Sequence, residues 1–345
     1  MTGKEAFLSR LRMGGSDGTP VFLRELTLAM DVRGVPTPDV YGPPYNAKLS
    51  AACALEFHRM MGHDALTGNM HSYSLHAFGG ITKYPEKGTP YLSSPPFADP
   101  SLMDGRDPSE IVDQTLEGMS ESSGIVAGKL PGVAMVMNVG GPVNTAGNLR
   151  GVEAFLMDTM SEPGIARDMV RFGTDVMKEI VSFMGNDVYD TVFLAAASDN
   201  PDMLGPEGFL EYSIQSVKEI TAFCKDMGLP VVFHPHGNFS ADERVPLLYE
   251  SVSTGIAGFQ FGEGNDPATI NAELSGKCSV MGGVDSFTTL LLGPDERIRR
   301  DVWKFLDVLE GDGHVATCSC SLNRGLPLGN VKAMVDAVRA WGGGE

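Results

Sequence analysis

Eight short apolar segments constrain the fold of this chain more than any other feature, because each ends in polar residues and is followed by a stretch with helical spacing. They are PVFLREL (20–26), HDALTGN (63–69), VAMVMNVGG (133–141), DTVFLAAASD (190–199), VVFHPHG (231–237), AGFQFGEG (257–264), CSVMGGVD (278–285) and HVATCSCS (314–321). Apolar strands that alternate with helices are typical of a parallel sheet covered on both faces. The pattern predicts an α/β fold, a (β/α)8 TIM barrel, with a doubly wound open sheet as the alternative.

The segments between the strands indicate one domain. Residues 152–185 and 208–228 have helical spacing, and the second ends at Gly228, shortly before Pro230. The stretch 80–108 is rich in proline, glycine and serine and lacks periodicity, so we interpret it as an excursion that either caps the barrel mouth or lies on the surface. We therefore predict a single domain over residues 1–345, a barrel with an N-terminal elaboration.

The charge and the apolar pattern disfavour several classes of partner. A formal net charge of -18 and a pI near 4.7 disfavour nucleic acid and anionic lipid. No apolar run approaches the roughly 20 residues that span a bilayer, and the first residues lack the features of a signal peptide. The five cysteines are an odd number spread thinly, which favours free thiols or metal ligands over disulfides. We expect a cytoplasmic protein with no membrane partner.

Polar side chains collect where the predicted strands end. If the barrel is correct, these ends meet at one mouth, where barrel enzymes place their catalytic groups. The residues in question are Glu25, Asn69, His71, Asn138, Asp199, His234, His236, Glu263, Asp285, Cys318 and Cys320. Because the strands themselves are apolar, so many polar ends predict a functional site at this face.

His234, His236 and Cys320 are the candidate metal ligands. Two histidines two positions apart on an extended segment place their side chains on the same side, so both reach one point. Cys320 follows the last predicted strand and offers a third ligand, which leaves one position open, as in catalytic zinc sites. Thiolate and imidazole together favour zinc. The alternative is two hydrogen-bonded or solvated histidines and a buried thiol.

Four further residues are candidates for catalytic roles. His71 and His76 follow the second predicted strand and are candidates for an acid, a base or a substrate donor, or else are surface histidines. Asp199 and Asp285 are candidates for carboxylates that orient the imidazoles, or else hydrate the barrel rim. Whether Cys318 or Glu263 also contacts the metal stays open.

The C-terminal half also resembles the uroporphyrinogen decarboxylase superfamily, and within it the zinc-dependent cobamide methyltransferases of the methylcobamide:coenzyme M type. The resemblance rests on GGPVNTAGNLRGVEAFLMDTM (140–160), DMLGPEGFLEYSIQSVKEI (202–220), VVFHPHGN (231–238), GGVDSFTTLLLGPDERI (282–298) and TCSCSLNRGLPLGNVKAMVDAV (317–338). The sequence resemblance is good from about residue 130 to the end of the chain and weak before it. The resemblance implies that His234 and Cys320 occupy zinc-binding positions of the family, and that His236 replaces a cysteine.

That replacement shapes the functional hypothesis. Two imidazoles and one thiolate leave zinc with a charge of about +1, a harder Lewis acid that suits an ether or alcohol oxygen. We therefore expect a methyltransferase that moves a methyl group between a small methylated substrate, for example a methoxy compound undergoing O-demethylation, and the cobalt of a cobamide carried by a partner corrinoid protein.

Three alternatives stay open. They are a methylcobamide:thiol methyltransferase of the coenzyme M type, a carboxy-lyase like uroporphyrinogen decarboxylase, and a non-enzymatic corrinoid-binding protein. The decarboxylase branch holds its substrate carboxylates with an arginine-rich loop, whereas the corresponding stretch VFLRELTLAM carries one arginine, Arg24.

Overall fold

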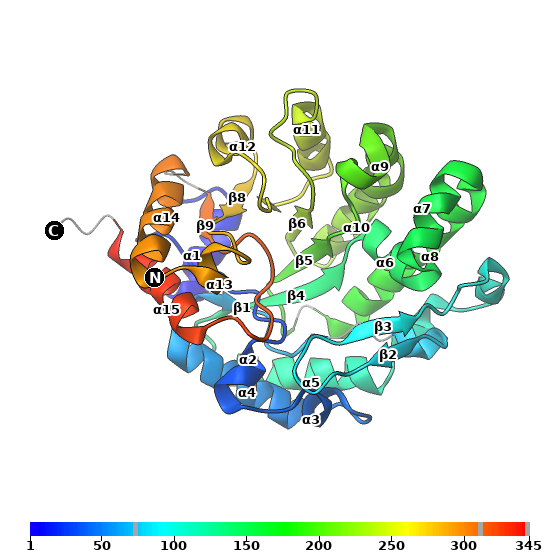
Figure 1. Ribbon diagram of the computed structural model, residues 1–345, viewed down its shortest axis with the longest axis horizontal. Coiled ribbons are helices and arrows are strands. Elements are labelled where there is room, and N and C mark those ends of the chain that lie inside the picture. Colours follow the sequence, from blue (N-terminus) through cyan, green and yellow to red (C-terminus); the bar gives the residue numbers. More distant parts are fainter. Residues whose placement is uncertain (72–74, 186, 310–312, 342–345) are drawn as a thin grey trace.

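The computed structural model describes residues 1–71, 75–185, 187–309 and 313–341 (Figure 1). A curled sheet of seven parallel strands forms its centre, with the order β1-β4-β5-β6-β7-β8-β9. The strands are β1 Ala65–Leu66, β4 Ala134–Gly140, β5 Thr191–Ala196, β6 Val231–Pro235, β7 Gly258–Gln260, β8 Ser279–Gly282 and β9 His314–Ala316. Each lies within a strand predicted from the sequence.

The first predicted strand, 20–26, forms no strand of its own. Val21 instead makes an isolated parallel bridge to Ala316 of β9, and Phe22 makes one to Ala65 of β1. This segment therefore contacts both edge strands of the sheet. The described fold is a TIM-barrel-like curled sheet with seven strands, where the sequence pattern predicted eight.

Helices surround the sheet on its outer side (Figure 1). The α-helices are α1 Gly3–Leu11, α2 Ala29–Arg33, α3 Thr37–Tyr41, α4 Ala47–Met61, α5 Gln114–Lys129, α6 Pro142–Arg150, α7 Val152–Ser161, α8 Pro163–Met184, α9 Pro201–Gly208, α10 Gln215–Asp226, α11 Val245–Ser253, α12 Pro267–Leu274, α13 Thr289–Leu292, α14 Asp295–Val308 and α15 Leu328–Ala340. Short 3-10 helices span Leu75–Phe78, Pro100–Met103 and Pro108–Ile111, and a π-helix spans Phe209–Ile214.

The two predicted helical stretches are each divided. Residues 152–185 form α7 and α8, because Pro163 cannot continue the first helix and instead begins the second. Residues 208–228 form the π-helix and α10, which ends before Gly228 in the left-handed conformation, φ +77°.

Alternate residues of the strands pack into two different cores, which explains why the strands are mostly apolar. Phe193 of β5 and Val232 of β6 belong to the cluster inside the curl of the sheet. Their neighbours Leu194 and Phe233 belong to the large cluster under the helices. A strand with both faces buried is apolar over most of its length. His234 lies two residues after Val232, so it faces the inside of the curl.

Helix α1 closes the N-terminal end of the inner core. Phe7 of α1 packs with its ring centroid 6.1 Å from that of Phe22, which in turn lies 5.6 Å from Phe193. The imidazole of His234 lies 5.7 Å beyond Phe193. A column of aromatic rings thus fills the interior from α1 up to the polar end of the strands.

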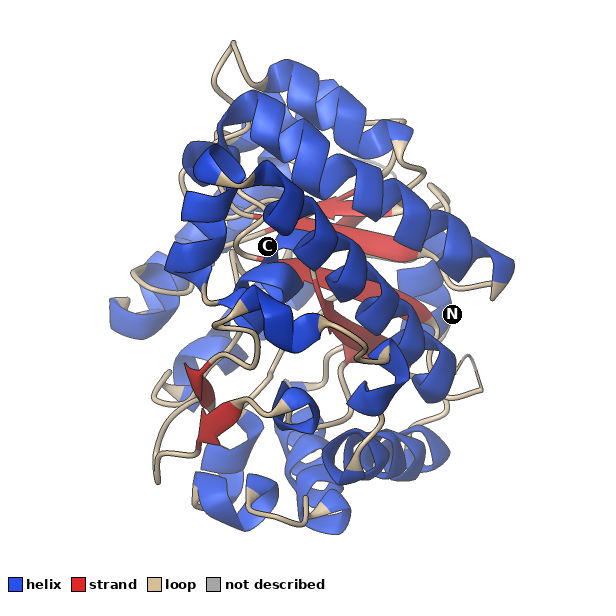
Figure 2. Cartoon of the chain, turned by 90° about the vertical axis from the view of Figure 1, so that its right-hand side faces the viewer, coloured by secondary structure: helices blue, strands red, loops and turns tan. Residues whose placement is uncertain are grey.

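The stretch 80–108 contains an antiparallel hairpin that the sequence pattern did not predict. Strands β2 Ile81–Lys83 and β3 Tyr91–Ser94 pair with each other and with no strand of the central sheet. Figure 2 shows the hairpin as two short strands apart from the central ones. This part of the excursion therefore has regular structure.

Within the described ranges, no helix is both long enough and apolar enough to cross a membrane.

Candidate metal centre and its cavity

Strand β6 brings His234 and His236 to the polar end of the sheet. His234 is buried, with 1% of its surface exposed, and His236 is partly exposed. Their rings lie 5.0 Å apart in an edge-to-face arrangement. Gly237 then turns the chain away with φ +110°, and a Cβ at this position would lie 2.5 Å from Oδ1 of Asn200. Glycine is therefore required directly after the second histidine.

The loop after β9 brings Cys320 to the same point. The backbone N–H of Cys320 donates to Oγ of Ser286, 3.3 Å away, in the loop after β8. The Cys320 sulfur lies 3.6 Å from Nε2 of His236. One ligand atom from each of His234, His236 and Cys320 lies within 4.8 Å of the other two. The structure thus brings together the three residues predicted as metal ligands.

The hydrogen bonds of His234 fit a metal ligand. Its Nδ1 lies 3.0 Å from the carbonyl oxygen of Gln260, and a carbonyl can only accept, so Nδ1 carries the proton. Nε2 is then a lone-pair donor, and it is buried without a hydrogen-bond partner. The side-chain amide of Gln260 donates to the carbonyl of Cys318 at 2.8 Å. A metal-binding histidine typically has its second nitrogen held in this way.

The electrostatics favour the protonation states that bind a metal. Burial by itself raises the pKa of the Cys320 thiol, but the closeness of its sulfur to the imidazoles of His234 and His236, together with the charge of Arg24, lowers this pKa to about 3. Burial lowers the pKa of His234, which keeps that imidazole neutral. A thiolate and neutral imidazoles are the forms that ligate zinc, so the donor set fits this ion.

Arg24 is a residue of the site that the predicted ligand set did not include. Its Nη2 lies 3.5 Å from the Cys320 sulfur, and its guanidinium carbon lies 4.8 Å from the centre of the Phe193 ring. Nε and Nη1 are buried without hydrogen-bond partners. The sequence feature that could have indicated Arg24 is its place near the end of the first predicted strand, beside Glu25. Both are charged residues in an otherwise apolar segment.

A cavity of about 440 Å³ opens beside the three ligands. Its polar lining consists of the ligands with Arg24, Thr82, Asn144, Asn148 and Ser321, and its apolar lining of Leu26, Leu75, Pro90, Tyr91, Leu92 and Ala195–Ala197. A few polar side chains at one side, here including the candidate metal ligands, and an apolar wall at the other are typical of a small-molecule site.

The predicted catalytic histidines line other cavities. His71 lies beside Asn138 in a separate, mostly apolar cavity, and burial lowers its pKa to about 3. His76 lies with its Nε2 2.6 Å from Oδ2 of Asp113, and this hydrogen bond raises its pKa. It lines a third cavity, which includes Tyr41 and Thr115.

Asp199 is fully buried and holds the start of α6. Its carboxylate accepts hydrogen bonds from the backbone N–H groups of Val143, at 3.3 Å, and Asn144, at 3.1 Å, and from Oγ of Ser213, at 2.6 Å. Burial raises its pKa to about 6, against these hydrogen bonds. Asp199 does not line the metal cavity, but Asn144 does. The structure thus connects Asp199 to the site through α6.

Asp285, Glu263 and Cys318 lie outside the group of three ligands. Oδ1 of Asp285 accepts from the backbone N–H groups of Phe287 and Thr288 at 2.7 and 3.1 Å, which fixes the turn before α13. Asp285 and Glu263 line a separate cavity. The Cys318 thiol is buried and donates to the carbonyl of Cys320 at 2.8 Å.

Glu25 is a buried carboxyl group next to Arg24, and it predicts a pH effect on stability. Its Oε1 accepts from the backbone N–H and the hydroxyl of Thr67, at 3.2 and 2.9 Å. Burial raises its pKa from 4.5 to about 7. Because the folded chain holds this proton more tightly, the stability that Glu25 contributes is present below about pH 4.5 and is lost as the pH rises through about 7.

Glu25→Gln is therefore expected to remove this part of the pH dependence. The difference in unfolding free energy between the variant and the wild type should grow by about 3 kcal/mol from pH 4.5 to pH 8, in favour of the variant. Urea unfolding at several pH values measures it. Glu250→Gln, at an exposed position, should follow the wild type; parallel curves for Glu25→Gln and the wild type would contradict the buried ionisation.

Comparisons with known proteins give one family and one close fold. The family model described as uroporphyrinogen decarboxylase (URO-D) matches residues 2–341. A solved structure described as a methyltransferase from Methanosarcina mazei superposes with a TM-score of 0.84 at 22% identity, covering 99% of both chains. A B12-independent methionine synthase from Shewanella sp. W3-18-1 gives a TM-score of 0.49 at 11% identity, covering 93% of this chain and 96% of that one. No curated protein matches the sequence significantly.

Proposed function

This chain belongs to the uroporphyrinogen decarboxylase (URO-D) family, and we propose that it is a zinc-dependent methyltransferase that moves a methyl group between a small methylated substrate, such as a methoxy compound, and the cobalt of a corrinoid protein. The observation that carries the proposal is the convergence of His234, His236 and Cys320 at one side of a cavity of about 440 Å³. The fold shared with a methyltransferase from Methanosarcina mazei supports it.

The three ligands set the chemistry of the proposed reaction. Zinc held by two neutral imidazoles and one thiolate would supply a Lewis acid of about +1 charge, suited to polarising the oxygen of a methyl ether. In the transfer the C–O bond breaks, its electron pair stays with oxygen, which takes up a proton, and the electron pair of cob(I)alamin forms the new Co–C bond. Gln260 and Ser286 orient the ligands through the hydrogen bonds described above.

The cavity defines which reactant enters it. A volume of about 440 Å³ accommodates a small molecule but not a corrinoid, so the methylated substrate would enter the cavity while the cobamide approaches its mouth. Asn144 and Asn148 of α6 offer amides to the bound substrate, and Asp199 acts as a positioning residue that holds the first turn of this helix. His71, His76 and Asp285 are then proposed for supporting roles outside the cavity.

Decarboxylation of a substrate with many carboxylates fits this cavity less well. Among the described residues that line it, Arg24 is the only lysine or arginine. Each buried carboxylate needs a paired cation or several hydrogen-bond donors, and a single guanidinium can pair with only one or two substrate carboxylates. Methyl transfer in the reverse direction, from a methylcobamide to a thiol, would use the same three zinc ligands. Only the identity of the methyl acceptor distinguishes it from the proposed reaction.

The proposal also covers the rest of the architecture. We propose a single barrel domain in which the segment at Val21 and Phe22 closes the sheet, supported by its bridges to β9 and β1. None of the five cysteines is paired in a disulfide, which supports a reducing compartment such as the cytoplasm.

Metal analysis and corrinoid spectroscopy test the proposed function. The purified wild type is expected to hold one zinc ion per chain, and the single variants His234→Ala, His236→Ala and Cys320→Ala less than about a tenth of that. Mixing the wild type with cob(I)alamin and a set of methoxy compounds should convert the cob(I)alamin spectrum to that of methylcobalamin. Full zinc retention in all three variants would exclude the site; zinc-free protein that binds a corrinoid protein unchanged would favour a binding role.

A further inference from the structure

The β2–β3 hairpin forms one wall of the metal cavity although it belongs to no part of the central sheet. Thr82 of β2, Tyr91 and Leu92 of β3, and Pro90 just before β3 all line the cavity. The hairpin itself is short, and a two-stranded hairpin alone is only marginally stable in water. Its position therefore depends on what holds its tip, residues 86–89.

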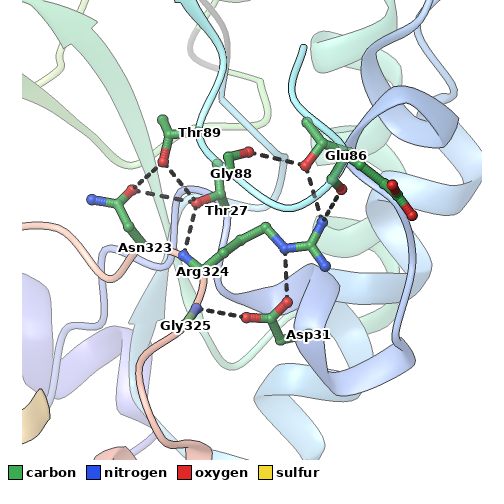
Figure 3. Close-up of polar contacts among 9 residues, drawn as sticks. Thr27, Asp31, Glu86, Gly88, Thr89, Asn323, Arg324 and Gly325 are labelled. Atoms are coloured by element: carbon green, nitrogen blue, oxygen red, sulfur yellow. Dashed lines mark hydrogen bonds and ion pairs between the residues drawn. The ribbon is translucent and has the colours of Figure 1, made fainter.

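The tip is held from α3. The backbone N–H of Thr37, the first residue of α3, donates to the carbonyl of Glu86 at 2.9 Å. The Thr37 hydroxyl donates to the carbonyl of Gly88, also at 2.9 Å. The side chain of Thr89 adds a third contact, because its hydroxyl donates to Oδ1 of Asn323 at 3.3 Å (Figure 3).

Arg324 connects this tip to two other segments (Figure 3). Its Nη1 donates to the Thr37 hydroxyl at 3.0 Å and to the carbonyl of Glu86 at 3.4 Å. Its Nε donates to Oδ1 of Asp31 in α2 at 2.7 Å. Only 6% of the Arg324 side chain is exposed, so these contacts are largely shielded from water, unlike most surface ion pairs.

The backbone around Arg324 completes the connection. Gly325 donates its N–H to Oδ2 of Asp31 at 2.9 Å, so both carboxylate oxygens are engaged by this loop. The N–H of Arg324 donates to the Thr27 hydroxyl at 3.2 Å. Arg324 lies four residues after Cys320, in the same loop after β9. One side chain thus joins the loop that carries a metal ligand, α2, and the tip of the cavity wall.

Cys320 is held independently of this cluster. Its backbone bonds to Ser286, and the N–H of Ser319 donates to the carbonyl of Val284 at 2.9 Å. Loss of Arg324 therefore leaves the anchors of the metal ligand in place but removes anchors of the hairpin.

We propose that Arg324 is a positioning residue that holds the β2–β3 hairpin closed over the metal cavity, and that it acts on the wall and not on the metal ligands. The functional meaning of this wall rests on the proposed function, because a closed apolar wall keeps water from the reacting groups. The positioning itself is a property of the chain and is testable without any reaction.

Limited proteolysis with trypsin reports the state of the hairpin. Lys87 lies exposed at the tip, and cleavage after it requires the tip to leave its partners. Arg324→Met should raise the rate of this cleavage by about tenfold or more. Thr37→Val, which removes only the hydroxyl, should raise it by a smaller factor. Arg324→Lys should restore part of the protection, because an ammonium reaches Asp31 but cannot bridge to Glu86 at the same time.

Replacing zinc with Co(II) shows, by its absorption spectrum, whether the metal site is intact in the same variants. Co(II) in place of zinc should give the same thiolate-to-metal absorption in Arg324→Met as in the wild type. Arg171→Met, which removes an exposed ion pair with Asp168, is the matched control and should change neither readout. If wild-type protein binds no Co(II), the proposed function is wrong, while the cleavage rates still decide the role of Arg324.

Two outcomes would overturn the proposal. Unchanged cleavage after Lys87 in both Arg324→Met and Thr37→Val would show that the cluster does not hold the hairpin. A lost or altered Co(II) spectrum in Arg324→Met with the hairpin still protected would show that Arg324 serves the Cys320 loop instead.

Discussion

Cys320→Ala is expected to abolish zinc binding and to lower methyl transfer by about a thousandfold or more, whereas Cys318→Ala, two residues away, keeps both. Removing the thiolate leaves two neutral imidazoles, which bind zinc far more weakly than a set that includes an anionic sulfur. The loss corresponds to about 4 kcal/mol of transition-state stabilisation. Zinc content and the rate of methylcobalamin formation measure the two effects.

Cys318 is the matched control because it has the same side chain in the same loop. Burial raises the pKa of the Cys318 thiol to about 11, so it stays protonated, and its sulfur donates to a backbone carbonyl. Its replacement should cost about 1 kcal/mol of stability and no zinc. Equal zinc loss in both variants would mean that the loop, and not the Cys320 sulfur, determines metal binding.

Gly283→Ala is expected to lower the free energy of unfolding by more than about 4 kcal/mol. A Cβ at Gly283 would lie 1.5 Å from the carbonyl oxygen of Thr317, so one of the two backbones has to move. The two segments are bonded on either side of this contact, from Thr317 N–H to the Gly282 carbonyl at 3.1 Å and from Ser319 N–H to the Val284 carbonyl at 2.9 Å. Because Cys320 follows directly, the variant should also lose zinc.

Gly164→Ala is the control for this substitution. Gly164 is the second residue of α8, and a Cβ there meets no atom within 4 Å. Alanine should be neutral or stabilise by up to about 1 kcal/mol, since it favours a helix more than glycine. Urea unfolding of both variants measures the contrast, and similar midpoints would contradict the close approach at Gly283.

The positions of the strands could be predicted from the sequence because a parallel sheet buried on both faces has continuous apolar segments. The lengths of the strands could not be predicted, because hydrogen bonding to neighbouring strands, and not composition, determines where each strand ends. HDALTGN pairs only at Ala65 and Leu66, and the segment at Val21 makes single bridges. The hairpin escaped prediction because β2 and β3 are short and carry no buried residue, so they leave no alternation in the sequence.

The convergence of His234 and His236 could be predicted because a spacing of two on a strand fixes which side both histidines face. Arg24 could not be assigned to the site in the same way, because its contact with Cys320 joins residues 296 positions apart. The predicted roles of His71, His76, Asp199 and Asp285 rested on strand ends alone. The structure places these four side chains around other cavities, turns and helix ends, so their roles stay predictions.

The separation of the hairpin from the central sheet has a consequence for how such a protein diversifies. The hairpin contributes wall residues but no ligand, and it shares no strand pairing with the segments that carry the ligands. Exchanging residues 81–94 as a cassette, with Thr37, Asp31 and Arg324 kept, would therefore change the shape of the pocket while leaving the metal centre intact. Under the proposed function, the shape of the pocket and the metal site would then lie in separable parts of the chain, which selection or engineering could alter independently.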